Sequence, residues 1–176
     1  MKLTSVPLPG AYLIEIEPVA DERGFFARTW CSREFKLHGL NPTVAQCSIS
    51  FNERKGTLRG MHYQVAPHAE AKLIRCSSGA IYDVILDLRP ASPNYCRWFA
   101  VELTAENRKM LYLPEGVAHG FQTLTDGAEV IYQISESYWP ECAHGARWDD
   151  PLFGIEWPIR SPILSPRDRA FPDFKP

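Results

Sequence analysis

Apolar and polar residues alternate through the middle of the chain. Every second position is apolar in residues 80–88, 98–103 and 129–135, and Asp83 and Asp87 stand on the face opposite the first apolar series. Alternation with a period of two is typical of strands that bury one face. We therefore expect three half-buried strands in these segments.

Turn-forming residues separate the alternating segments, at 77–79, 89–94, 114–116 and 125–127. The chain also has 15 prolines, and proline interrupts helices and central strands, which indicates many turns. A helical pattern is confined to residues 32–39 and to one turn within 104–110. Short strands joined by such loops favour a β-sandwich or barrel over alternating strands and helices. We predict an all-β fold, a jelly roll with a few short helices.

Length and charge limit the architecture and the partners. The chain has 176 residues without a linker or a repeat, so we expect a single domain spanning residues 1–176. With 19 basic and 21 acidic residues, it has no bulk attraction for nucleic acid or for an anionic membrane. It carries neither a signal-peptide pattern nor a transmembrane-length apolar run. The odd number of cysteines, 5, suits reduced thiols in a cytoplasmic protein.

Two histidines lie next to glycine-rich turns and are candidates for chemistry. The Pro-x-Gly-x-x-His pattern that ends at His119 resembles the second motif of the cupins, which are small jelly-roll proteins, and His62 lies where their first motif would be. Many cupins bind a metal through such histidines and a carboxylate. Here Gln64 stands at the position of a ligand, and an amide is a poor ligand for a transition metal. Glu70 lies in a proline-containing loop and does not replace it, so we expect a cupin-like pocket without metal or other cofactor.

A pocket without metal has to work with acids, bases and fixed charges. A neutral histidine is a suitable general base, and a tyrosine stays protonated at neutral pH, so Tyr132 is a candidate acid. Lys72 begins an apolar strand, where a charge is out of place unless it faces a site. Arg59 and Arg23 carry the planar paired donors that bind phosphate. Each of these residues, taken alone, also fits an ordinary packing or surface role.

Taken together, the motifs resemble those of the dTDP-4-dehydrorhamnose 3,5-epimerase family over nearly the whole chain and in the family's order. The matching segments are 21–26, 56–64, 81–89, 103–107, 112–121, 147–151, 154–158 and 164–169. The resemblance implies a metal-free jelly-roll homodimer that acts on a nucleotide-diphospho-4-keto-6-deoxy sugar. It implies inversion of C3, C5 or both through an enolate.

The resemblance also assigns catalytic roles. His62 would be the base, oriented by Asp168 of the C-terminal tail, and Tyr132 would return a proton from the other side. Lys72 would hold the oxyanion that develops on the C4 oxygen. His119 would help to position the sugar.

Further matches concern the nucleotide. Arg59 matches the diphosphate-binding arginine of the family, and Arg23 matches an arginine that reaches across the dimer from the N-terminal strand. Gln46 and Tyr138 match positions that contact the nucleotide.

Several positions depart from the family pattern on the nucleotide side. Cys47 and Ser48 replace an acidic residue and an asparagine, and Arg28 stands where many members carry glutamate. Ser48 and Arg28 are therefore also candidate binding residues. Away from the nucleotide, Ser137 replaces a common second tyrosine, which would open the pocket beside Tyr132. We hypothesise retained chemistry with a changed preference for the base, or inversion at one carbon only.

Two other classes of function remain open: a metal-dependent cupin enzyme, against which Gln64 argues, and a sugar-nucleotide binding module without catalysis. Against the binding module stands the full set of His62, Asp168, Tyr132 and Lys72, which a protein that only binds has no reason to keep. One of these residues lies in the C-terminal tail. This irregular, proline-rich segment from Leu164 onwards contains the proposed partner of the base. We therefore expect it to fold back over the mouth of the barrel and complete the site.

Overall fold

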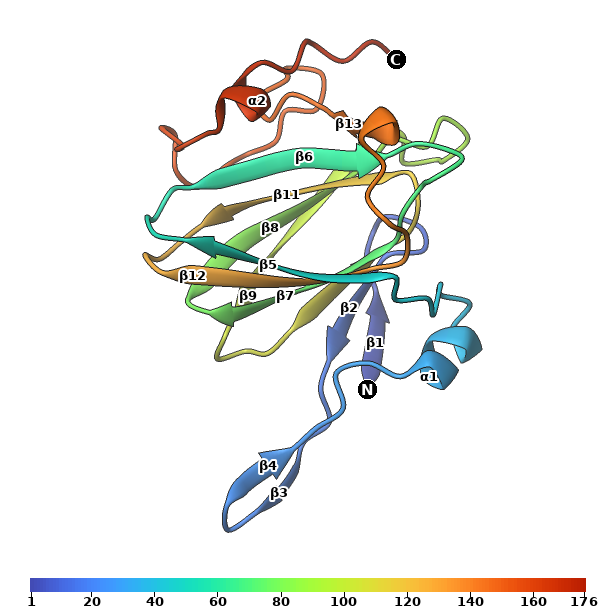
Figure 1. Ribbon diagram of the computed structural model, residues 1–176, viewed down its shortest axis with the longest axis vertical. Coiled ribbons are helices and arrows are strands. Elements are labelled where there is room, and N and C mark those ends of the chain that lie inside the picture. The colour runs from blue at the N-terminus through green and yellow to red at the C-terminus, as the bar shows by residue number, and fades with distance from the viewer.

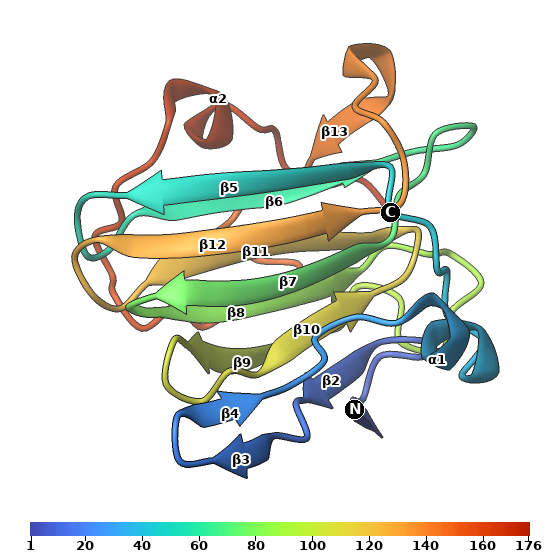
Figure 2. The same ribbon diagram turned by 60° about the horizontal axis from the view of Figure 1, so that its bottom comes forward.

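The computed structural model describes residues 1–176 and consists mainly of antiparallel strands, which form the two sheets of a cupin-like jelly roll (Figures 1 and 2). The six-stranded sheet has the order β1 (Lys2–Ser5), β2 (Tyr12–Glu15), β10 (Met110–Leu113), β7 (Lys72–Ser78), β12 (Ala128–Ile134), β5 (Gln46–Asn52). The five-stranded sheet has the order β13 (Ala143–Gly145), β6 (Leu58–Gln64), β11 (Val117–Thr123), β8 (Ala80–Asp87), β9 (Trp98–Thr104). The remaining elements are the hairpin strands β3 (Val19–Asp21) and β4 (Gly24–Phe26), the helices α1 (Ser32–Leu37) and α2 (Pro166–Arg169), and the 3-10 turn η1 (Pro140–Cys142).

Three apolar clusters hold these layers together. The largest lies between the sheets and includes Ile74, Ile85 and Phe121. A second covers part of the outer face of the six-stranded sheet, where Phe35 of α1 packs edge-on against Tyr112. The third cluster lies on the outer face of the five-stranded sheet under the C-terminal segment. Both faces of the central strands are therefore covered.

The third cluster corrects the predicted orientation of residues 80–88. Val84 and Leu86 face outward, where the C-terminal segment buries them. Asp83 and Asp87, which the alternation placed on a polar face, are both 0% exposed. The prediction that this strand buries only one face was wrong, because the sequence pattern does not show what packs on the outside of a sheet.

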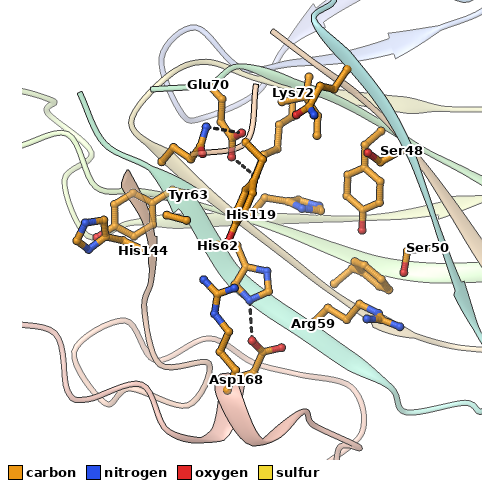
Figure 3. A pocket seen from close by; sticks show the side chains of 18 of the residues that line it. Ser48, Ser50, Arg59, His62, Tyr63, Glu70, Lys72, His119, His144 and Asp168 are labelled. Carbon is orange, nitrogen blue, oxygen red and sulfur yellow. Dashed lines mark hydrogen bonds and ion pairs between the residues drawn. The ribbon is translucent and has the colours of Figure 1, made fainter. Parts of the chain in front are cut away.

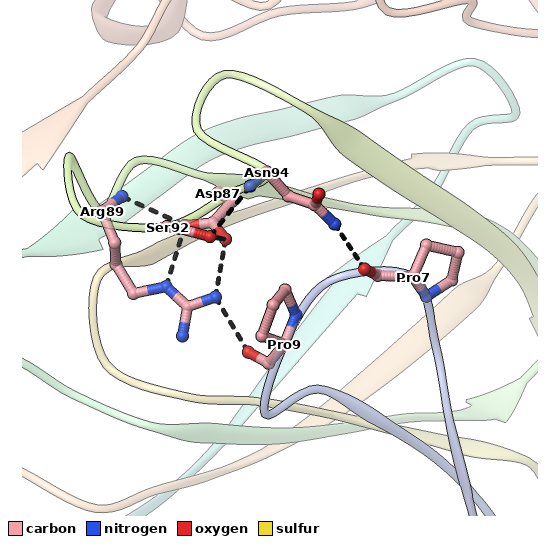
Figure 4. A network of polar contacts seen from close by, with 6 residues as sticks. All are labelled: Pro7, Pro9, Asp87, Arg89, Ser92 and Asn94. Atoms are coloured by element: carbon pink, nitrogen blue, oxygen red, sulfur yellow. Dashed lines mark hydrogen bonds and ion pairs between the residues drawn. The ribbon is translucent and has the colours of Figure 1, made fainter.

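Each buried aspartate has a polar partner. Asp87 accepts hydrogen bonds from Arg89 Nε at 2.8 Å, Arg89 Nη2 at 2.6 Å and Ser92 Oγ at 2.7 Å (Figure 4). The same Arg89 donates to the carbonyl of Pro9. This network joins the β8–β9 loop to the segment between β1 and β2. Asp83 lies deeper, beside the cavity described below.

The three alternating segments are strands, as predicted, and residues 32–37 form α1. The helical turn predicted within 104–110 is present as a single turn over residues 105–107, in which the Arg108 N–H donates to the Thr104 carbonyl at 3.1 Å, and no helix continues from it. Asn107 and Thr104 exchange side-chain to backbone hydrogen bonds, with Thr104 N–H donating to Asn107 Oδ1 at 3.1 Å and Asn107 N–H to Thr104 Oγ1 at 2.9 Å. These reciprocal bonds cap the start of the turn, and the left-handed φ of Arg108, 53°, ends it.

The hairpin β3–β4 projects away from the sandwich (Figure 1). Its apolar side chains are exposed, with Phe26 at 75%. None of the helices in the structure has the length and apolar character needed to cross a membrane.

Candidate active site

A cavity of about 490 Å³ opens between the two sheets. Among the residues that line it are the predicted Gln46, Ser48, Arg59, His62, Lys72, His119, Tyr132, Tyr138 and Asp168. Other residues also line the cavity, although the sequence analysis did not name them as site residues: Ser50, Tyr63, Gln64, Glu70, Phe121, Ile134, Ala143, His144, Ser165 and Arg167. Its volume falls within the ~300–1,000 Å³ usual for a small-molecule site.

His62 lies on β6 and contacts the C-terminal tail. Its Nε2 lies 2.6 Å from Asp168 Oδ1 (Figure 3). Asp168 sits on α2, a single turn that begins with Pro166 and is capped by Ser165, whose Oγ accepts the Asp168 N–H at 3.0 Å. Serine at the cap followed by proline is a strong local signal for a helix start. The tail therefore brings a carboxylate to the histidine, as expected.

Asp168 is buried, yet its charge is favoured. Burial alone would raise the pKa of its carboxyl, but hydrogen bonds from His62 and the Gly60 N–H outweigh burial and lower it below 3.8. Asp168 is then anionic at neutral pH and accepts a hydrogen bond from Nε2–H of the ring. Because Nε2 is engaged in this way, Nδ1 is the ring nitrogen that is free to accept a proton.

His119 is the cross-strand neighbour of His62 on β11. Its Nε2 lies 2.7 Å from Oδ1 of Asp83. Burial raises the pKa of the Asp83 carboxyl, although His119 opposes the rise. The cavity thus contains a second histidine–aspartate pair, and in this one the carboxylate lies between the sheets.

Tyr132 faces this pair from the other sheet. It lies on β12, and its ring meets that of His119 edge-on with centroids 5.9 Å apart. Burial, with a further contribution from the negative charge of Asp83, raises the pKa of the Tyr132 hydroxyl above its ordinary value of 10.0. The phenol therefore stays protonated across the neutral range and is a proton donor.

Lys72 begins β7, as predicted, and points into the cavity. Its Nζ lies 2.7 Å from Oε1 of Glu70. The carboxylate of Glu70 also accepts from Gln64 Nε2 at 3.2 Å. From the sequence, Glu70 and Gln64 were considered only as metal ligands. The signal for the ion pair was that Glu70 lies two residues before Lys72, so that both can share one face.

Polar groups along one rim suit a phosphorylated ligand. Alternate residues of β5 line this side of the cavity, and Arg59 of β6 is held in place by its Nε–H, which donates to Asn52 Oδ1 at 2.8 Å. Arg167, next to Asp168, also lines the cavity. Neither arginine forms an ion pair within the chain, so both guanidinium groups are free to bind an anion.

Arg23 and Arg28 do not line the cavity of their own chain. Arg23 lies between the strands of the projecting hairpin and pairs with Asp21 at 2.5 Å. Arg28 follows the hairpin and lies 3.6 Å from Glu34 of α1.

The side chains favour acid–base chemistry. No group of three or more His, Cys, Asp or Glu side chains is arranged to hold a metal ion. Instead a histidine–aspartate pair, a tyrosine and a lysine paired with a carboxylate lie around one cavity. These are the groups needed to remove a proton, stabilise the resulting negative charge and return a proton.

Comparison with known proteins shows which family and fold the chain shares. A family model described as dTDP-4-dehydrorhamnose 3,5-epimerase matches residues 5–176. The chain is 38% identical to the dTDP-4-dehydrorhamnose 3,5-epimerase of Shigella flexneri over 169 residues. This alignment covers 96% of the chain and 93% of the Shigella protein. The crystal structure of the Elizabethkingia anophelis enzyme of that name superposes with a TM-score of 0.96 at 38% identity, over 99% of this chain and 96% of its own. The Bacillus anthracis enzyme, solved with TDP and PPi bound, gives a TM-score of 0.94 at 38% identity, over 98% and 99%.

Proposed function

The chain belongs to the dTDP-4-dehydrorhamnose 3,5-epimerase family, and we propose that its cavity inverts C3 and C5 of dTDP-4-dehydro-6-deoxyglucose without a cofactor. The coarser activity follows from the family: the protein is an isomerase that epimerises a nucleotide-linked 4-keto-6-deoxy sugar. What we propose beyond this activity is the role of each residue, dTDP as the nucleotide and inversion at both carbons.

The first step is removal of a proton next to the C4 ketone. His62 takes the proton from C3 or C5 through its free ring nitrogen, and the C–H electron pair moves into an enolate whose negative charge rests on the C4 oxygen. Asp168 fixes the ring through Nε2 and stabilises the imidazolium that forms. Lys72 holds the enolate oxygen, the kind of contact whose loss costs about 2.7–4 kcal/mol of barrier.

The second step returns a proton to the opposite face of the carbon. Tyr132 donates its hydroxyl proton as the enolate collapses to the ketone, and the tyrosinate and imidazolium then regain their starting states by exchange with water. One observation carries this proposal: His62 and Tyr132 lie on different sheets and line one cavity. Inversion requires a base and an acid on opposite sides of the sugar, and the two walls of the sandwich supply them.

The nucleotide end is proposed on charge and position. Arg59 binds the diphosphate from the rim, and Arg167 is placed to assist it. Gln46, Ser48 and Tyr138 line the same cavity and contact the nucleoside, while His119 positions the sugar. Titration with dTDP, CDP, GDP and UDP tests the base: a clear preference for dTDP supports the assignment, and a preference for another nucleotide refutes it.

Proton NMR in heavy water tests the reaction itself. Incubation with dTDP-4-dehydro-6-deoxyglucose is expected to replace the hydrogens at C3 and C5 with deuterium. His62→Ala abolishes exchange at both carbons, whereas Tyr132→Phe changes the product distribution more than the exchange. Exchange at one carbon only would identify a single-centre epimerase, and its absence with every nucleotide sugar would refute the function.

We further propose that residues 1–176 form one domain that works as a homodimer in the cytoplasm. The hairpin and the outer face of the edge strand β5 both expose apolar side chains, with Phe26 at 75% and Ile49 at 63%. Surfaces of this kind mark interfaces. In the proposed dimer each hairpin packs on the other copy and brings Arg23 to its cavity.

Mixing two inactive variants tests this exchange of hairpins. Arg23→Ala and His62→Ala each disable their own homodimer, but a mixed dimer contains one complete site. An equimolar mixture that has exchanged subunits should recover roughly a quarter of the wild-type activity, because half of the dimers are mixed and each has one intact site. No recovery, with mixed dimers shown by native mass spectrometry, would place Arg23 outside the partner's site.

A further inference from the structure

A buried ion pair forms part of the cavity wall. Lys72 Nζ and Glu70 Oε1 are 2.7 Å apart, and their side chains are 9% and 10% exposed. Figure 3 shows the pair together on one side of the cavity, with Asp168 on the other. Removing two charges from water is costly unless each finds a close partner. No other acidic side chain forms an ion pair with Lys72, so Glu70 alone supplies that partner.

Both oxygens of the Glu70 carboxylate are engaged. Oε1 faces Lys72, and Oε2 accepts from Gln64 Nε2 at 3.2 Å. Gln64 is itself fixed, because Nε2 also donates to the carbonyls of His68 and Ser137, at 3.0 and 3.1 Å. The Trp139 N–H donates to its Oε1 at 2.6 Å. The buried amide therefore clamps two loops and sets the position of the carboxylate between them.

The backbone keeps the two charged residues on the same side. Ala71 stands between them and is 2% exposed. Its N–H donates to Ser135 Oγ at 2.8 Å, and its carbonyl accepts the Ser135 N–H at 3.0 Å. In extended chain, residues two apart share a face, so anchoring Ala71 against the neighbouring strand directs Glu70 and Lys72 together into the cavity.

We propose that Glu70 is a positioning residue that holds the ammonium of Lys72 in the direction of the enolate oxygen. The inference rests on the proposed role of Lys72 as the group that stabilises this oxygen. A carboxylate is required because it offers two acceptors, one for Lys72 and one for Gln64. An amide at this position offers a single acceptor, and its second polar group would face a donor.

Substitution of Glu70 should affect turnover and leave nucleotide binding intact. Glu70→Gln is expected to lower kcat about tenfold to a hundredfold, the usual effect of losing a hydrogen bond to a charged group. The Kd for dTDP, which lacks the keto sugar, should stay within about twofold, since the polar contacts of Glu70 go to Lys72 and Gln64 and to none of the residues assigned to the nucleotide. Glu70→Asp keeps both acceptors and the charge and should recover part of the loss. The matched control is Glu141→Gln, at an exposed carboxylate outside the cavity.

A double-mutant cycle separates positioning from a general structural role. If Glu70 acts through Lys72, Glu70→Gln in a Lys72→Met background should change the exchange rate by less than about twofold. The same fold-loss in both backgrounds, or an unchanged kcat in Glu70→Gln, would overturn the inference. Wild-type exchange is measured first: its absence refutes the proposed function and with it this role, whereas wild-type exchange with an unaffected Glu70→Gln refutes the role of Glu70 alone.

Discussion

Gly145 is the position at which a single methyl group should disconnect the tail from the site. It pairs with His62 across β13 and β6, and a Cβ there would overlap the ring of Phe171. The same ring packs edge-on against His62, with centroids 6.0 Å apart. Phe171 follows α2 closely in the chain, so moving it moves Asp168. Gly145 has no left-handed φ, so alanine strains the packing and not the backbone.

The size of the effect follows from the overlap. Ordinary carbon contacts are ~3.5–4.0 Å, so the ring has to retreat by more than about 1 Å. Overpacking of this kind typically costs about 1–3 kcal/mol. The overpacking destabilises only the state in which the tail is docked. At ~1.4 kcal/mol per tenfold, it lowers the ratio of docked to undocked tail about 5- to 150-fold.

We expect Gly145→Ala to lower the deuterium exchange rate at C3 and C5 by tens of fold and to make the tail more sensitive to proteolysis. The free energy of unfolding should fall by no more than about 3 kcal/mol, because undocking relieves the strain. Removing the ring in Gly145→Ala/Phe171→Ala should restore part of the activity, with Phe171→Ala alone as the control. A Gly145→Ala protein with the full exchange rate would show that the tail does not depend on this contact.

Two further perturbations address the tail and the buried carboxylate of the β8–β9 loop. A chain that ends at Ile163 should remain folded by circular dichroism but lose about 10²–10⁴-fold in exchange rate with the partner of its base; full activity would contradict a role for the tail. Arg89→Met should destabilise the protein by about 3–5 kcal/mol by leaving Asp87 buried and unpaired. Burial would raise the pKa of Asp87, but hydrogen bonds from Arg89 and Ser92 lower it below 3.8; the wild type therefore gains stability above the unfolded pKa and loses it as the pH falls through the folded one. Urea unfolding at several pH values gives the free energy of unfolding as a function of pH. For Arg89→Met this free energy should rise less steeply with pH than in the wild type, or fall, and an equal dependence on pH in both proteins would refute the coupling.

The strands were predictable because their signal is local. Alternation marked residues 80–88, 98–103 and 129–135, and strands formed at all three. The contents of each face were not predictable, since they depend on distant segments. Asp83 is buried because the side chain of His119, on the neighbouring strand, pairs with it, and Val84 is buried on the outer face because the C-terminal segment covers it.

The site was predicted in a similar way, through motifs and not through contacts. The resemblance pointed to Asp168 although a helix of four residues leaves almost no periodic signal, and the structure places that residue against His62. Glu70 was set aside because it was judged only as a metal ligand. Its use depends on Gln64 and Lys72 meeting it at once, and sequence spacing alone does not show such a convergence.

The position of α2 in the chain has a consequence for biosynthesis. All thirteen strands precede Asp168 in the sequence. A nascent chain grows from its N-terminus, so every strand of both sheets has been synthesised before the partner of His62. The part of the chain that completes the site is therefore the last to become available for folding, and it brings with it the cover of the third apolar cluster.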